Sequence, residues 1–480
     1  HSNWRPARAK WKFYAGHPAT PLHSGIVAGG LPTLCCGNMR TIASFLTTFC
    51  LLGIVRLAAE PMPDLAAMTE AEVPSLLGFY KDLHTYPELS LREEATAGKV
   101  ASELRAAGLE VTEKVGGHGV VGVLKNGDGP TILIRTDLDA LPVKEQTGLP
   151  YASAVTVKDE QGNLVPVMHA CGHDIHMSCF VGTARVLAKS RATWKGTLVF
   201  IGQPAEERVL GARFMLRDGL FSRFPKPDKA LALHVWGDMP AGTVGLTSGY
   251  ALANVNTVEI IVHGVGGHGS APQTTKDPIV LASEIVLALQ TIVSREIRPG
   301  DPAVVTVGTI HGGTKNNIIS DEVRMGLTLR SYDDGVRQHL ISAIQRITRG
   351  LGIAAGLPEE KLPEVKVSEE AAPALFNQPE MVVRLRKVFE DALGQENVVI
   401  RDPVMGAEDF AEYGRTKEKV PICLFWLGSV EAGRVAAARA AGEMLPSLHS
   451  PLYAPDPEPT IRTGIRAMTA AVIEMLDPAR

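Results

Sequence analysis

Three short apolar segments constrain the fold of this chain most strongly. They are TILIRTD from Thr131, TLVFIGQ from Thr197 and ALALHVW from Ala230. Each segment is continuously apolar rather than alternating, which is the pattern of strands covered on both faces in a mostly parallel sheet. A helical stretch over 175–190 lies between the first two segments. We therefore predict an α/β domain built on a mostly parallel sheet.

Charged or metal-binding residue types stand at or just after the end of each of these segments. They are Asp137 and Asp139, then Glu206 and Glu207, then His234. In open α/β sheets, binding sites form at the carboxyl ends of the strands. The sequence therefore predicts a polar site at this edge of the sheet.

From Asn254 the pattern changes to alternation in VNTVEIIVHG, and Asp277 with Pro278 then predicts the start of a helix. Two further strand-like segments, an amphipathic helix and a short strand at EVKV follow. The order β-α-β-β-α-β is the ferredoxin-like arrangement. We predict a small α+β domain over 250–368, inserted into a larger domain made of 61–249 and 369–480.

Length and composition indicate a globular enzyme rather than a nucleic-acid-binding protein. The 480 residues exceed one ordinary core, so two globular units are expected. Lys and Arg number 48 against 52 Asp and Glu, which leaves a formal net charge of -4 and no basic face for a nucleic acid.

Residues 1–60 are interpreted as a leader region. Arg40 precedes an apolar run over 42–55, and Ala58 and Ala59 follow, which is the layout of a secretory signal peptide starting at Met39. The run is shorter than the roughly 18 to 20 residues that cross a bilayer, so no stable membrane insertion is expected after processing. A buried or disordered extension is the alternative. The expected location is the periplasm or the exterior, or the cytoplasm if the leader is not functional.

The cysteines do not form a disulfide framework. Three of them, Cys35, Cys36 and Cys50, fall in the leader region, and the remainder of the chain holds Cys171, Cys179 and Cys423. In an oxidising compartment, Cys171 between two histidines is better protected as a metal thiolate than as a free thiol.

The segment MHACGHD, over 168–174, crowds His169, Cys171 and His173 together. Three interpretations compete: a metal site, a cysteine nucleophile with His173 or His169 as its base, and polar residues gathered by chance in a buried loop. A thiolate with an imidazole suits zinc and neighbouring divalent metals.

The segment QPAEE strengthens the metal interpretation, because it places Glu206 and Glu207 directly after a buried strand. Adjacent glutamates in an extended segment point in different directions, so one can bind metal while the other activates water. A solvated acidic pair that opens a helix is the alternative. His234 and His449 would each be structural if considered singly, but together with the other groups they complete a ligand set.

Six motifs in this order resemble the M20 metallopeptidase family: MHACGHDIH, QPAEE, LALHVW, GVGGHGSAP, MGAEDF and PSLHSP. The resemblance is greatest to its aminoacylase, hippurate hydrolase and auxin-conjugate amidohydrolase branch, and it covers about 76–476. It implies a catalytic domain with a site for two metal ions and an inserted lid domain that often mediates dimerisation.

The resemblance implies two divalent ions, manganese or zinc, and a role for each motif residue. The implied ligands are Cys171, His173, Glu207, His234 and His449, with Cys171 as the bridge. Glu206 would be the general base. Asp139 would hold a ligating imidazole from behind, or would instead cap a turn or helix.

The lid would contribute His268 as a hydrogen-bond donor to the oxyanion. In a homodimer, this histidine could come from the partner copy. A loop histidine packed on glycines is the alternative. Asn317 and Arg330 resemble positions that hold the substrate carboxylate or the oxyanion, although a turn amide and a solvated strand charge would also explain them. Gln273 stands where the family often has histidine and Ser320 where it has proline, so lid geometry and substrate preference are open.

The resulting hypothesis is a metal-dependent hydrolase that cleaves the amide bond of N-acyl amino acids or related small conjugates, acting as a homodimer. A dipeptidase of the same fold, a cysteine-nucleophile amidase using Cys171 and a non-catalytic binding protein are the alternatives. The thiol mechanism leaves Glu207, His234 and His449 without a role, and a binding protein would not need Glu206.

Overall fold

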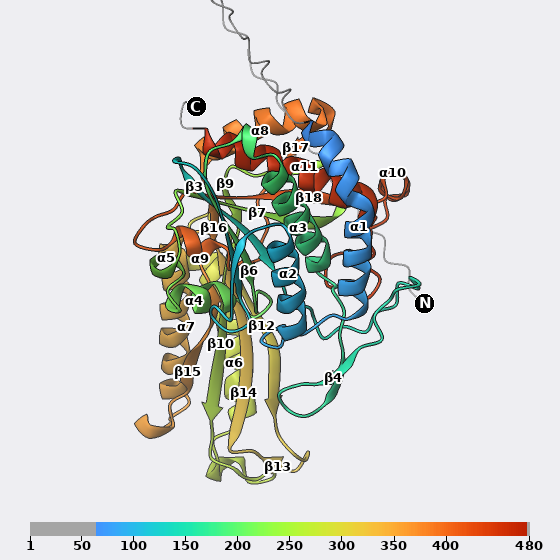
Figure 1. The fold of residues 1–480 in the computed structure, drawn as a ribbon. Helices are drawn as coiled ribbons and strands as arrows, with labels where there is room; N and C mark the ends of the chain where they lie inside the picture. The colour runs from blue at the N-terminus through green and yellow to red at the C-terminus, as the bar shows by residue number, and fades with distance from the viewer. Residues whose placement is uncertain (1–63, 478–480) are drawn as a thin grey trace, which may run out of the picture. The chain divides into compact units, whose positions relative to one another are not determined.

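The computed structural model describes residues 64–477 (Figure 1). The expected signal peptide, its start at Met39 and the three leader cysteines therefore lie outside the described residues. The described residues belong to one compact unit, so the domain limits expected at 250 and 368 stay predictions.

The larger sheet has eight strands in the order β1-β2-β6-β3-β7-β18-β8-β17. Its central strands β6, β3, β7 and β18 are mutually parallel, and antiparallel pairs occur toward both edges. This confirms the predicted mostly parallel sheet. The strands are β1 Glu110–Glu113, β2 Val120–Asn126, β3 Thr131–Asp137, β6 Gly196–Gln203, β7 Lys229–Pro240, β8 Val244–Leu246, β17 Val398–Ile400 and β18 Ile422–Val430.

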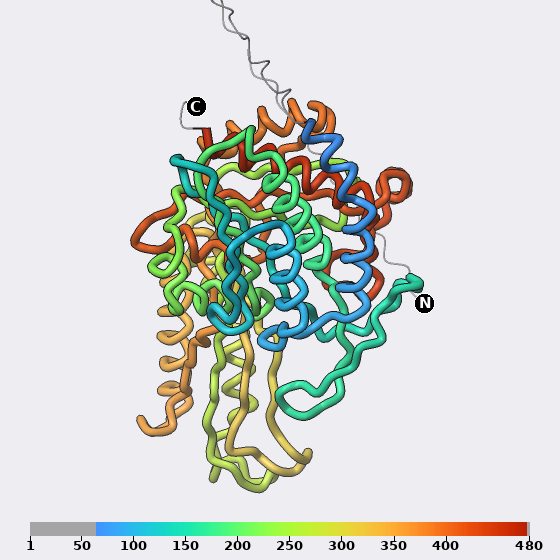
Figure 2. The backbone as a smooth tube through the Cα atoms, viewed as in Figure 1, coloured from blue at the N-terminus to red at the C-terminus, as the bar shows by residue number. Residues whose placement is uncertain are grey.

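Helices cover both faces of this sheet and bury a separate hydrophobic cluster on each. Figure 2 shows the last helix, in red, beside the first helix, in blue, and these two also pack on α3. One face holds α1 Leu65–Thr85, α2 Glu94–Ala106, α3 His173–Lys189, α8 Pro379–Leu393 and α11 Pro457–Leu476. The other holds α4 Gly211–Arg217, α5 Leu220–Arg223 and α9 Ala411–Gly414, while α10 Ala432–Ala441 packs on β7.

A second, antiparallel sheet has the order β12-β14-β10-β15. Its elements follow one another as β10 Asn254–His263, α6 Pro278–Thr291, β12 Ala303–Gly312, β14 Glu322–Ser331, α7 Asp334–Ala354 and β15 Glu364–Ala372. This is the predicted β-α-β-β-α-β order, and the strand order is that of a ferredoxin-like sheet. As predicted, Asp277 caps α6 by accepting from the backbone N–H of Ile279 at 2.9 Å, and Pro278 is the first helical residue. We call β10 to β15 the lid.

Short elements complete the described part of the chain. The strands β9 and β16 pair with each other where the chain enters and leaves the lid. The remaining elements are β4 Thr156–Lys158, β5 Leu164–Pro166, β9 Gly249–Leu252, β11 Gly267–His268, β13 Ile318–Ile319, β16 Leu375–Asn377, η1 Arg191–Thr193, η2 Pro272–Thr274, η3 Ile292–Glu296, η4 Glu359–Lys361 and η5 Gln395–Asn397.

The helical segment Pro278–Glu296 is long and apolar enough to cross a membrane by length and composition. One side of it packs in the hydrophobic cluster of the lid through Leu281, Ile285 and Leu289. Its other side exposes Val280 and Leu287, the latter 73% exposed. The core helix of a soluble protein meets the same criterion, and the exposed apolar side is the feature that needs an explanation.

Candidate metal centre and active site

The loop before α3 turns sharply at Gly172. This residue has a φ of 75°, and a Cβ atom there would lie 2.6 Å from Cγ2 of Val235. Only glycine fits such a left-handed, crowded position without strain. The turn presents Cys171, which is 6% exposed, and starts α3 at His173, which is fully buried. The glycine thereby brings a sulfur and an imidazole to the same point.

The five candidate ligands lie together at this point. The Sγ atom of Cys171 is 3.6 Å from Nε2 of His234. The Oε1 atom of Glu207 is 3.9 Å from Nε2 of His173 and 3.5 Å from Nε2 of His449. The ligand atoms of Cys171, His173 and His234 lie within 4.8 Å of one another, and so do those of Cys171, Glu207 and His449. Cys171 belongs to both groups, which is the position that a bridging ligand requires.

Two atoms of this cluster are buried without a hydrogen-bond partner among residues 64–477: Nε2 of His173 and Oε1 of Glu207. Such atoms are rare in folded proteins, because a buried polar group without a partner is destabilising. They face each other, and a divalent cation would satisfy both. The donor set of one thiolate, three imidazoles and one carboxylate suits zinc and related divalent ions. The residues therefore fit a metal centre.

Backbone carbonyls orient two of the imidazoles. Nδ1 of His173 donates to the carbonyl oxygen of Asp139 at 2.7 Å, and Nδ1 of His234 donates to that of Val235 at 2.8 Å. Because a carbonyl oxygen only accepts, Nδ1 carries the proton and Nε2 keeps its lone pair for a metal. The carboxylate of Asp139 is farther from Nδ1 of His173, at 3.5 Å. The imidazole of His173 is thus oriented mainly by the backbone carbonyl of Asp139, whereas its carboxylate was expected to do so.

The side chain of Asp139 instead holds the loop that carries the two glutamates. Its Oδ2 atom accepts from the backbone N–H of Glu207 at 3.0 Å and from Oγ of Ser90 at 2.6 Å. Oε1 of Glu93 accepts from the backbone N–H of Ala205 at 2.8 Å, where φ is 49°. Glu93 was not predicted from the sequence to have a role at the site. Two buried carboxylates thus hold a strained turn immediately before and after Glu206.

The prediction that Glu206 and Glu207 point apart in an extended segment was wrong. The segment is a turn, because Ala205 and Val209 both have positive φ angles. As a result both carboxylates approach Nε2 of His173, at 3.8 Å for Glu206 and 3.9 Å for Glu207. Burial, followed by the negative charge of Glu408, raises the pKa of Glu206 well above its ordinary value. The raised pKa favours proton uptake by this carboxylate.

A buried ionic network that the sequence analysis missed lies behind Glu206. The guanidinium of Arg135 is 2.8 Å from Asp137, 2.9 Å from Glu408 and 3.3 Å from Asp409. All of these side chains are buried. Glu206, Glu408 and Asp409 alone would resemble a cation site, but Arg135 already supplies the positive charge there. The only sequence signal was a single arginine inside an apolar strand and the ED pair of MGAEDF.

The structure brings one of the three predicted lid residues to the site. Arg330 on β14 lines a cavity of about 390 Å³ together with Glu206 and Glu207. Its guanidinium is half-buried, burial lowers its pKa, and no carboxylate pairs with it within the described residues. His268 and Asn317 do not line this cavity and are exposed. His268 lies on β11, which pairs with β13, and Figure 1 shows β13 at the end of the lid.

Burial and then the negative charge of Glu207 raise the pKa of the Cys171 thiol well above its ordinary value. His173 and His169 do not offset this effect, since Sγ of Cys171 has its close nitrogen contact with His234. His169 is itself buried, and neither of its ring nitrogens has a hydrogen-bond partner in the described chain. Burial of this kind disfavours a free nucleophilic thiolate, and a bound cation would stabilise the thiolate form.

The chain belongs to the peptidase family M20/M25/M40, whose family model matches residues 133–443. Thermostable carboxypeptidase 1 of Saccharolobus solfataricus is 37% identical over 354 residues, 73% of this chain and 84% of that protein. N-acetylcysteine deacetylase of Bacillus subtilis is 35% identical over 358 residues, 74% of this chain and 88% of that protein. The expected family resemblance is confirmed, and the chain is a hydrolase of this family.

A solved structure is similar in fold. It is that of the Bacillus subtilis YXEP protein, described as a dinuclear metal-binding peptidase of the M20 family. It superimposes with a TM-score of 0.65 at 30% sequence identity and covers 85% of this chain and 100% of that one. The fold is thus one that binds two metal ions in a similar protein.

Proposed function

We propose that this protein hydrolyses the amide bond of N-acyl amino acids, with two manganese or zinc ions held by Cys171, His173, Glu207, His234 and His449. The observation that carries the proposal is the pair of buried, unpartnered atoms, Nε2 of His173 and Oε1 of Glu207, beside a sulfur shared by two ligand groups. A relative named for deacetylation of N-acetylcysteine supports the substrate class.

The residues around the ligands account for substrate binding and proton transfer. Metal ions bound there would polarise the amide carbonyl and lower the pKa of water. Glu206 takes the proton from the attacking water and later gives it to the departing amine, which its raised pKa favours. Arg330 is half-buried and has no carboxylate partner in the described part of the chain, and it pairs with the substrate carboxylate. The lid excludes water from the site.

The decisive experiment incubates the metal-loaded chain with N-acyl amino acids and dipeptides and measures released amine. Cleavage of N-acyl amino acids that stops with a chelator and returns with manganese or zinc supports the proposal. Activity that survives chelation but is lost on thiol alkylation would establish Cys171 as a nucleophile instead. The ratio of the rates with added manganese and with added zinc identifies the metal that serves better.

Peptide hydrolysis is the second candidate function, because a relative of comparable identity is named a carboxypeptidase. A carboxypeptidase or dipeptidase would use the same Arg330 for the free carboxylate, so the site geometry fits both substrates. Turnover of dipeptides without turnover of any N-acyl amino acid would favour it.

We also propose a homodimer formed through the lid. Leu287 and Val280 on α6 expose apolar surface, and β12 is an edge strand of the lid sheet. A second copy on this face would cover both features. It would also explain why His268 is exposed and outside the cavity of its own chain, since the partner's site could then receive it.

Export of the protein remains part of the proposal and rests on the leader sequence over 39–59. Amino-terminal sequencing of the protein recovered from its native compartment tests it. A new terminus close after residue 59 supports export, and an intact leader on a cytoplasmic protein contradicts it.

A further inference from the structure

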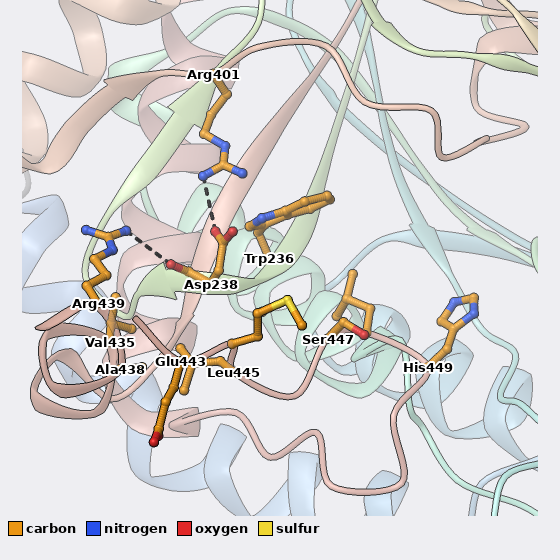
Figure 3. Close-up of a pocket in the computed structure, with 13 residues that line it drawn as sticks. Trp236, Asp238, Arg401, Val435, Ala438, Arg439, Glu443, Leu445, Ser447 and His449 are labelled. Atoms are coloured by element: carbon orange, nitrogen blue, oxygen red, sulfur yellow. Dashed lines mark hydrogen bonds and ion pairs between the residues drawn. The ribbon is translucent and has the colours of Figure 1, made fainter. Parts of the chain in front are cut away.

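A second cavity of about 600 Å³ adjoins the candidate metal centre (Figure 3). In Figure 3, His449 lies on one side of it and Arg439 on the opposite side. Trp236, Leu448 and His449 line both this cavity and the one that contains Glu206. The two cavities therefore share a wall that includes a metal-ligand candidate, and we call the second one the side cavity.

The walls of the side cavity are mainly apolar. Helix α10 contributes Val435 and Ala438, and the loop after it contributes Leu445 and Leu448. The indole of Trp236 forms a further wall. A cavity of this size lies within the range of roughly 300–1,000 Å³ that is typical of small-molecule sites. Its composition suits a hydrocarbon group.

Both arginines of the side cavity already have partners in the protein. Nη1 of Arg401 is 3.2 Å from Oδ1 of Asp238, and its guanidinium lies 5.2 Å from the centroid of the Trp236 ring. Nη2 of Arg439 donates to the backbone carbonyl of Asp238 at 3.3 Å. Glu443 adds a second negative charge to the lining. The cavity thus balances its charges internally and does not select an anion.

The positions of the two cavities indicate which end of the substrate faces the lid. Arg330, Thr257 and Thr328 of the lid line only the metal-centre cavity, and no lid residue lines the side cavity. With the substrate carboxylate at Arg330 and the amide at the ligands, the acyl group would point toward the wall at His449 that the two cavities share.

We propose that the side cavity binds the acyl group of the substrate and that this group is an aliphatic or aromatic chain larger than acetyl. The inference rests on the proposed function and adds its acyl specificity. Met444 is 97% exposed at the lining of the cavity. A large apolar side chain left in solvent there is explained by contact with such an acyl group.

The test compares N-acetyl-, N-butyryl-, N-hexanoyl- and N-octanoylalanine. Each methylene buried in an apolar cavity raises kcat/KM by up to about fourfold. The variant Ala438→Phe fills the side cavity, and Ala437→Phe places the same side chain at an exposed position of α10 that does not line it. Neither residue belongs to the catalytic machinery.

We expect Ala438→Phe to lower kcat/KM for N-octanoylalanine by about tenfold or more and to leave N-acetylalanine unchanged. Ala437→Phe should affect neither substrate. In calorimetry on metal-free protein, N-octanoylalanine should bind the Ala438→Phe variant more weakly than it binds the Ala437→Phe variant or the unsubstituted protein. This measurement does not depend on turnover. Circular dichroism of each variant verifies that it has folded.

Equal losses for both substrates, or no loss for N-octanoylalanine, would overturn the acyl-site assignment. Equal kcat/KM for all four chain lengths in the unsubstituted protein would also overturn it, while leaving the proposed hydrolase function intact. If none of the four substrates is cleaved, both proposals fail.

Discussion

A buried histidine of α1 offers a sharp test of how the metal-binding loop is supported. Nδ1 of His84 is 2.6 Å from Oδ2 of Asp174, the residue after His173, and its Nε2 is 3.1 Å from Oε1 of Glu145. These side chains are 1% exposed. Burial alone would lower the pKa of His84, but hydrogen bonds to Asp174 and Glu145 raise it from 6.5 to about 10. His84 is therefore a cation between two carboxylates.

Replacing His84 by glutamine removes this charge and leaves the two carboxylates buried together. A rise in pKa from 6.5 to about 10 corresponds to roughly 5 kcal/mol at about 1.4 kcal/mol per pKa unit. Loss of one partner from a buried ion pair costs about 3–5 kcal/mol. We expect His84→Gln to lower the free energy of unfolding by an amount in this range near pH 6.5.

The pH dependence of this loss has a definite sign. Below pH 6.5 His84 is protonated in both the folded and the unfolded chain, so its stabilisation is complete. Between pH 6.5 and about 10 only the folded chain keeps the proton, so the stabilisation declines as the pH rises. The difference between the variant and the unsubstituted protein should thus be largest near pH 6.5 and should shrink toward pH 10.

The measurement is the urea midpoint from tryptophan fluorescence at pH 6.5, 8 and 9.5, on metal-free protein so that loss of metal does not contribute. His118→Gln, in the turn between β1 and β2, changes a partly exposed histidine and serves as the matched control. A loss for His84→Gln that is the same at pH 6.5 and 9.5 would refute the charge argument and indicate packing alone.

Three further substitutions test other parts of the account. Glu206→Gln should lower kcat by roughly 10²–10⁴-fold with unchanged metal content by plasma mass spectrometry; full turnover would remove Glu206 from its role. Arg135→Met should cost about 3–5 kcal/mol in urea unfolding, because it leaves three buried carboxylates without their cation; near-neutral stability would mean that they are protonated. Leu287→Arg should convert dimer to monomer in light scattering, and a variant that still dimerises would locate the interface elsewhere.

The sheet and the candidate ligands could be predicted because their signals are local in the sequence. Continuous apolar runs predict parallel strands, and the ends of such strands converge whatever the loops do. The pair Cys171 and His173 could be recognised in the sequence because a single glycine separates them. The N-cap at Asp277 was likewise predictable, since capping depends on neighbouring residues only.

Other parts of the site depend on contacts between residues that are distant in the sequence. Arg135 looks like an interruption of an apolar strand until the fold brings Glu408 and Asp409 to it. Glu93 has no motif of its own, and its role follows only from its bond to Ala205. The side cavity depends on how α10 packs beside β7, which no periodicity in the sequence specifies.

The most direct test of the metal centre is the metal content of the purified chain, measured together with its activity during stepwise removal of metal. The account predicts two divalent ions per chain, with amide hydrolysis falling as they are removed and returning with manganese or zinc. Full hydrolysis by a chain from which all metal has been removed would contradict it.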